Sequence, residues 1–146
     1  MASRRVRPAL AAAEGSRRLI TLDTSGLLAL IDSRERHHDS VLEAFDADPG
    51  PHVVPAALLG EIGHFLEPRA ATAFLLDLAE ENYELDCGEH DLVRAAALAQ
   101  RYESLPLGLV DAAVIACAER RGGRVLTLDR RHFDVIAREV ALEILP

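Results

Sequence analysis

A ten-residue stretch near the N-terminus decides the fold: Leu19-Ile20-Thr21-Leu22-Asp23-Thr24-Ser25-Gly26-Leu27-Leu28. Its first four residues are apolar or β-branched, which is typical of a buried strand. Asp23 follows at once, and Thr24 or Ser25 can cap a helix that continues through Ile31. A carboxylate in this position contributes little to a core. In open α/β sheets the carboxyl ends of the strands are where ligands bind, so Asp23 is a candidate functional residue.

Strands and helices alternate along the rest of the chain. Short apolar segments predict five strands, at residues 20–22, 52–54, 83–85, 124–128 and 141–145. Apolar residues at helical spacing predict six helices, at residues 24–31, 39–46, 55–67, 70–81, 89–102 and 109–121. Pro55 is expected in the first turn of its helix, where the missing N–H costs nothing. This alternation favours an α/β three-layer sandwich, with helices on both faces of a central parallel sheet of about five strands.

The composition indicates one folded domain. The chain has 146 residues, 49% of them hydrophobic and spread along its length, so a packed core is expected. Five arginines lie within residues 1–18, which we expect to form a flexible basic tail ahead of a domain at residues 19–146. Cys87 and Cys117 have no zinc spacing and are expected to be buried free thiols in a reducing cytoplasm. No run approaches the ~18 apolar residues of a membrane span.

Charge and residue usage exclude several mechanisms. The net charge is −8, which is unusual for a nucleic-acid binder unless many acids gather in one site. The chain has 16 basic residues and no lysine, so each is an arginine. The missing lysine excludes P-loop and Schiff-base chemistry and argues against a phosphoacceptor receiver domain. Aromatic residues make up only 4%, which argues against a base-stacking platform.

Four carboxylates occupy positions that a structural role explains poorly. Asp23 and Asp129 follow the first and fourth predicted strands. Asp111 opens a predicted helix, and Glu61 lies within another helix amid apolar neighbours. Taken singly, each acid also has an ordinary structural explanation, namely a helix cap, a turn residue, a charge at a helix terminus or a residue on the solvated edge of a helix. Together they favour a shared site, because strand ends and helix starts meet at one edge of a parallel sheet.

A divalent cation would explain this set of acids. Three or four neighbouring carboxylates raise one another's pKa, and a cation removes the conflict. An all-oxygen set without Cys or His favours Mg²⁺, or Mn²⁺ as a substitute, over zinc. Such a metal activates water and stabilises charge on a phosphoryl oxygen, which is the chemistry of phosphodiester hydrolysis.

Four segments of the chain resemble the PIN-domain family, specifically the VapC-type toxin ribonucleases of toxin–antitoxin modules. The segments are Leu22-Asp23-Thr24-Ser25, Val54-Pro55 through Glu61, Leu109-Val110-Asp111-Ala112-Ala113-Val114-Ile115-Ala116, and Leu126-Thr127-Leu128-Asp129-Arg130-Arg131-His132-Phe133. Each segment alone is weak evidence for the resemblance, but the four in this order and spacing are strong evidence, and together they span about residues 19–146. The basic tail is not part of the family pattern.

The resemblance implies a fold, an activity and partners. It implies a Mg²⁺-dependent endoribonuclease on a five-stranded parallel sheet, inhibited by a cognate VapB-like antitoxin and forming a homodimer. Asp23 and Asp111 would be the metal ligands. Glu61 and Asp129 would complete the catalytic site, directly or through waters. The hydroxyls of Thr24, Ser25 and Thr127 would position these acids without binding the metal themselves.

Other functions remain as alternatives. A PIN-like chain could act as a non-catalytic binding or regulatory module, or as a structure-specific DNA nuclease. The pairs Glu61-x-x-His64 and Glu35-x-x-His38 have the spacing of di-iron ligands, but the predicted strands interrupt any long helix bundle. His132 is expected at the surface, close enough to Asp129 to touch substrate. Arg130 and Arg131 are candidates for contacts with RNA phosphates.

Overall fold

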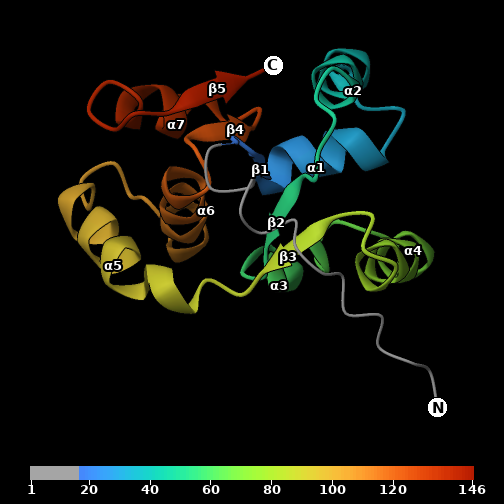
Figure 1. The fold of residues 1–146 in the computed structure, drawn as a ribbon, viewed down its shortest axis with the longest axis horizontal. Helices are drawn as coiled ribbons and strands as arrows, with labels where there is room; N and C mark the ends of the chain where they lie inside the picture. Colours follow the sequence, from blue (N-terminus) through green and yellow to red (C-terminus); the bar gives the residue numbers. More distant parts are fainter. Residues whose placement is uncertain (1–16) are drawn as a thin grey trace.

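The computed structural model describes residues 17–146, which form one five-stranded parallel sheet covered by helices on both faces (Figure 1). The strands are β1 (Ile20–Leu22), β2 (Val53–Pro55), β3 (Glu84–Asp86), β4 (Arg124–Leu126) and β5 (Glu143–Leu145). Their order across the sheet is β3-β2-β1-β4-β5, and each neighbouring pair is parallel. The predicted α/β class and five-stranded parallel sheet are confirmed.

Helices form the two outer layers. They are α1 (Thr24–Ile31), α2 (His38–Asp46), α3 (Leu58–Ile62), α4 (Pro68–Ala79), the 3₁₀ helix η2 (Glu89–Asp91), α5 (Leu92–Arg101), α6 (Leu109–Arg120) and α7 (Arg130–Ile136). α6 packs on α5 and against β1, β2 and β4, whereas α1 and α2 pack together on the opposite side of the sheet (Figure 1). This arrangement buries β1 on both faces, including the polar side chain of Thr21.

One close approach holds α1 against the central strands. A Cβ atom added to Gly26 would lie 2.3 Å from the carbonyl oxygen of Leu126, so only glycine fits at this point. The backbone N–H of Asp23 donates to the same carbonyl at 3.0 Å. The end of β1 and the end of β4 are therefore fixed side by side, and the residues that follow them share one edge of the sheet.

Several local predictions are wrong around the second strand and the helices after it. Pro55 ends β2 instead of starting a helix, because its missing N–H costs the ladder nothing: Ala56 N–H donates to Asp86 instead. The predicted helix at 55–67 shortens to α3, and Phe65, which has the helical spacing of an inward-facing residue, is 64% exposed. Leu75 on α4 has the same kind of spacing and is 54% exposed.

Two further differences concern the C-terminal third and the cysteines. The fourth strand ends at Leu126 rather than at residue 128, and α7 is a helix that was not predicted. Just past the strand end, the hydroxyls of Ser25 and Thr127 accept the backbone N–H groups of Leu128 and Asp129, so these groups do not extend the ladder. Cys117 is buried as predicted, whereas Cys87 is exposed and that expectation is wrong.

The predicted tail lies mostly outside the described residues. Of residues 1–18, only Arg17 and Arg18 are described, and Arg18 donates to the carbonyl of Gly122 at 2.7 Å. The boundary between tail and domain stays a prediction. Within residues 17–146, no helix has the length and apolarity needed to cross a bilayer.

Candidate functional site

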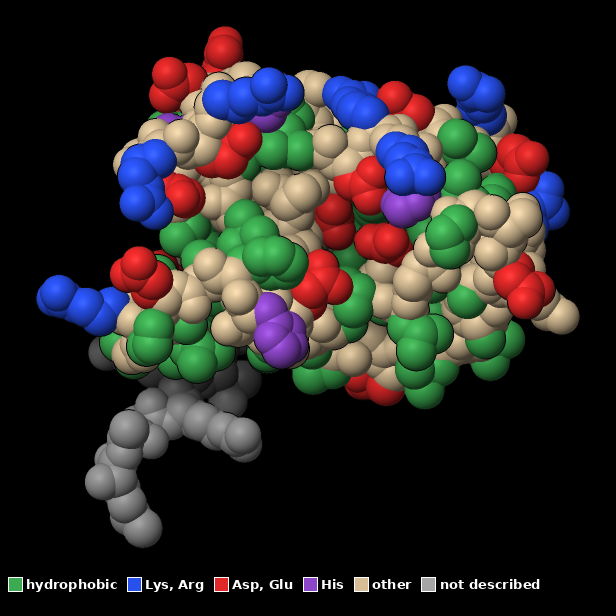
Figure 2. Space-filling view, turned by 180° about the vertical axis from the view of Figure 1, so that it is seen from behind, with side chains coloured by type: hydrophobic (Ala, Val, Ile, Leu, Met, Phe, Trp, Pro, Cys, Tyr) green, Lys and Arg blue, Asp and Glu red, His purple; other side chains and the backbone are tan. Residues whose placement is uncertain are grey.

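The four acids singled out in the sequence line one pocket of about 280 Å³ at the carboxyl ends of β1 and β4. Its lining residues are Asp23, Thr24, Ser25, Leu28, Glu61, Phe65, Asp111 and Asp129. Asp23 directly follows β1 and precedes α1, Asp111 lies in the first turn of α6, and Asp129 precedes α7. Figure 2 shows acidic side chains gathered near the middle of this molecule's rear face, with arginines along the rim.

Asp23 is the most buried of the four, with 4% of its surface exposed. The hydroxyl of Thr127 donates to its Oδ2 at 2.7 Å, and the hydroxyl of Ser25 donates to the same oxygen at 3.2 Å. Burial raises the pKa of Asp23, and these hydrogen bonds oppose that rise. The carboxylate is therefore held in one orientation, but its charge is not neutralised by a cation among the described residues.

The hydroxyls behind Asp23 are tied to the loop after β4. Ser25 Oγ accepts the backbone N–H of Leu128 at 2.9 Å. Thr127 Oγ1 accepts the backbone N–H of Asp129 at 3.0 Å. Each hydroxyl therefore positions an acid while it satisfies the backbone of the segment that carries the next acid.

Asp111 shows how strongly these acids interact. Its pKa is raised to about 6, first by burial and then by the negative charges of Asp23, Asp129 and Glu61. Neighbouring charges raise this pKa because the four carboxylates lie close together, where solvent screens their repulsion only weakly. A cation among these acids would stabilise their charged forms.

His132 belongs to this cluster, although it was expected at the surface. Its Nδ1 lies 2.9 Å from Asp129 Oδ2 and 3.9 Å from Asp111 Oδ2, and its side chain is only 19% exposed. Ligand atoms of Asp111, Asp129 and His132 all lie within 4.8 Å of one another. The sequence did contain a signal for this contact, because residues three apart at a helix start face each other.

The residues present fit a hard divalent cation. Most donors are carboxylate oxygens, which suit Mg²⁺ and Mn²⁺. The Oγ1 of Thr24 is buried beside the pocket and has no hydrogen-bond partner among the described residues. Buried polar groups commonly bind an ordered water, and Mg²⁺ bound by one or two carboxylates usually keeps several waters.

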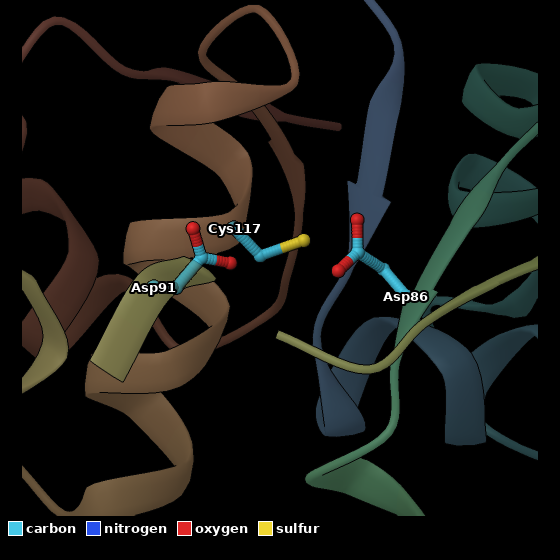
Figure 3. A group of neighbouring side chains, drawn as sticks. All are labelled: Asp86, Asp91 and Cys117. Atoms are coloured by element: carbon cyan, nitrogen blue, oxygen red, sulfur yellow. The ribbon is translucent and has the colours of Figure 1, made fainter. Parts of the chain in front are cut away.

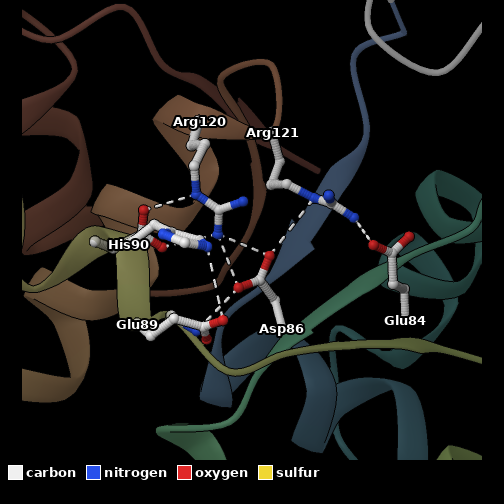
Figure 4. Close-up of polar contacts among 8 residues, drawn as sticks. Glu84, Asp86, Glu89, His90, Arg120 and Arg121 are labelled. Atoms are coloured by element: carbon white, nitrogen blue, oxygen red, sulfur yellow. Dashed lines mark hydrogen bonds and ion pairs between the residues drawn. The ribbon is translucent and has the colours of Figure 1, made fainter. Parts of the chain in front are cut away.

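A second group, Asp86, Asp91 and Cys117, has ligand atoms equally close together but a different character (Figure 3). Arg120 from α6 reaches both acids: its Nε donates to Asp91 at 2.7 Å and its Nη2 donates to Asp86 at 2.8 Å (Figure 4). Arg121 extends the network to Glu84. The guanidinium of Arg120 thus supplies the positive charge that a metal would bring, so this cluster is a structural ion-pair network.

Comparisons with known proteins agree with this geometry. Residues 20–139 match the PIN domain family. The chain is 36% identical over 121 residues to Ribonuclease VapC26 of Mycobacterium tuberculosis, covering 79% of this chain and 90% of that protein.

Two solved structures share the fold. The structure of Mycobacterium tuberculosis VapC20, described as a sarcin–ricin loop cleaving toxin, superposes with a TM-score of 0.71 at 21% identity. That match covers 87% of this chain and 99% of VapC20. A toxin–antitoxin complex from Klebsiella pneumoniae matches with a TM-score of 0.57 at 20% identity, over 78% of this chain and 89% of that one. The chain belongs to the PIN domain family, among proteins of the VapC type.

Proposed function

We propose that this protein is a metal-dependent endoribonuclease, the toxin of a VapBC-type toxin–antitoxin system that acts in the cytoplasm. The observation that carries the proposal is the convergence of Asp23, Glu61, Asp111 and Asp129 on one pocket. The relative at 36% identity is named a ribonuclease, which supports RNA as the substrate. A toxin–antitoxin complex among the structural neighbours supports an antitoxin partner, and a homodimer within that assembly is part of the proposal.

The catalytic roles follow from the position of each acid. Asp23 and Asp111 would hold Mg²⁺, for which Mn²⁺ can substitute: Asp23 is the most buried acid of the pocket, and Asp111 is half-buried in the first turn of α6, where the charge of Asp23 helps to raise its pKa. Glu61 and Asp129, which also line the pocket, would complete the metal site directly or through waters, and one of them would accept the proton of the attacking water. A bound divalent cation supplies Lewis acidity toward the scissile phosphate and activates that water.

RNA cleavage by the purified protein tests this proposal. Structured RNA is incubated with Mg²⁺, with Mn²⁺ or with EDTA, and 5′ ends are mapped. We expect cleavage with either metal, none with EDTA, and at least about a 100-fold loss in Asp23→Asn and Asp111→Asn. Asp46→Asn is the matched control, because Asp46 is an exposed acid on α2 away from the pocket.

The alternatives give different results in the same assay. Cleavage that survives Asp111→Asn or EDTA would contradict the metal mechanism. Binding of RNA or antitoxin without turnover would indicate a regulatory module. Cleavage of DNA flaps but not of RNA would indicate a structure-specific DNA nuclease.

A further inference from the structure

His132 engages both oxygens of the Asp129 carboxylate. The imidazole Nδ1 lies 2.9 Å from Oδ2, and the backbone N–H of His132 donates to Oδ1 at 3.3 Å. The backbone contact is the ordinary N-terminal cap of α7, and the imidazole takes no part in it. The imidazole contact is therefore an addition to the cap, and it needs another explanation.

The imidazole stands between carboxylates that come from two different helices. Nδ1 lies 3.9 Å from Asp111 Oδ2 on α6, while it contacts Asp129 at the start of α7. The Asp129 side chain is 31% exposed, so the capping bond alone leaves its second oxygen free to rotate toward solvent. A donor at Nδ1 removes that freedom and keeps Oδ2 on the side of Asp111.

We propose that His132 is a positioning residue that donates from Nδ1 to Asp129 and holds this carboxylate ready for the divalent cation. This role rests on the proposed function, and it adds His132 to the four acids of the site. Groups that orient metal-binding carboxylates commonly change metal affinity by 10–100-fold when they are removed. The imidazole acts through Asp129, and it does not itself contact the metal or the RNA.

Metal affinity, measured without substrate, tests the role of His132. Mn²⁺ binding is followed by the electron paramagnetic resonance signal of the free ion, and Mg²⁺ binding by competition with Mn²⁺. We expect His132→Ala to raise both dissociation constants about 10-fold. His132→Asn should keep both within about 2-fold of the wild type, because the Asn amide N–H₂ can replace Nδ1–H.

Controls separate positioning from folding. His90→Ala, which removes an exposed imidazole remote from the pocket, should leave both constants unchanged. Far-UV circular dichroism checks each variant, and His132→Leu replaces the alanine variant if the latter fails to fold, because leucine fills the space without a donor.

Three outcomes would overturn the inference. One is unchanged affinity in His132→Ala and His132→Leu, and another is loss of affinity without rescue in His132→Asn. The third is a result that would make the imidazole a metal ligand: His132→Ala loses affinity for Mn²⁺ but not for Mg²⁺, and the spin-echo spectrum of Mn²⁺ bound to the wild type shows coupling to a nitrogen nucleus. If the wild type binds neither metal, the proposed function itself fails; if it binds both and His132 is irrelevant, only this inference fails.

Discussion

The hydroxyl of Thr127 donates a 2.7 Å hydrogen bond to the carboxylate of Asp23 across 104 residues of sequence. Thr127 is completely buried, and it also accepts the backbone N–H of Asp129. One side chain thus links the acid after β1 to the acid before α7.

Replacing this hydroxyl should destabilise the fold. Thr127→Val keeps the shape but leaves the buried Asp23 without its shortest donor, and a hydrogen bond to a charged group is worth about 1.5–3 kcal/mol. We expect a loss of about 2 kcal/mol in the free energy of unfolding, measured by urea denaturation at neutral pH. Thr127→Ser retains the hydroxyl and should lose less than half as much. Equal losses in both variants would mean that packing of the methyl group matters more than the hydrogen bond.

Removing the charge of Asp111 should stabilise the metal-free protein. The pKa of Asp111 is about 6 in the folded chain against an ordinary value of 3.8, so between these values the folded chain binds more protons than the unfolded chain. The stability of the wild type in EDTA should therefore fall as the pH rises through about 6. Asp111 is half-buried, so solvent screening reduces the effect, and we expect Asp111→Asn to gain about 1 kcal/mol at neutral pH.

The pH dependence supplies the check on this gain. Urea midpoints in EDTA should differ between Asp111→Asn and wild type at about pH 7.5 but converge at about pH 4. Glu103→Gln, which removes an exposed acid, is the control and should change neither value. A gain that is equal at both pH values would show that it does not come from the ionisation of Asp111.

The contact between Gly26 and Leu126 predicts a large effect from one methyl group. Gly26→Ala places a Cβ 2.3 Å from a backbone oxygen that cannot move without disturbing β4, so we expect a loss of about 3 kcal/mol or failure to fold. Gly60→Ala is the matched control, because nothing lies within 4 Å of its added Cβ. That variant should gain up to about 1 kcal/mol from helix propensity. Thermal unfolding of both variants measures the contrast, and similar melting temperatures would contradict the close approach.

Arg120 should be essential for stability but not for chemistry. Its removal in Arg120→Ala leaves Asp91, which is 5% exposed, without its cation, and breaking such a pair typically costs 3–5 kcal/mol. Arg120 itself is partly exposed, so we expect the lower end, about 3 kcal/mol. Urea denaturation measures the loss, with Arg138→Ala, an exposed arginine after α7, as the control. Folded Arg120→Ala protein should cleave RNA at the wild-type rate; a specific loss of cleavage would assign this network to the active site.

The sequence predicted the parts of this protein that depend on local pattern. The apolar strand Ile20–Leu22 and the helix Leu109–Arg120 were identifiable because burial on a sheet or against a helix imposes a period that is visible within a few residues. The gathering of four acids was predictable from topology alone, since parallel strands end at the same edge of a sheet.

Other features depended on neighbours that no local pattern reveals. Pro55 reads equally well as the start of a helix and as the end of a strand, and the pairing of β2 with β3 made it the latter. Phe65 has the spacing of a core residue, but α3 ends at Ile62 and leaves it beside the pocket. The pairing of Asp86 and Asp91 with Arg120, some 30 residues later, is likewise visible only in the folded chain.

The sequence by itself determined the class of fold and the identity of the acids at the sheet edge, because those follow from residue type, period and chain order. Only the tertiary structure decided how the acids are held. Thr127 reaches Asp23 because β4 pairs with β1, and His132 reaches Asp129 because α7, a helix that the sequence did not predict, begins at Arg130. These contacts depend on distances of about 3 Å between distant segments, and such distances are fixed by packing and not by composition.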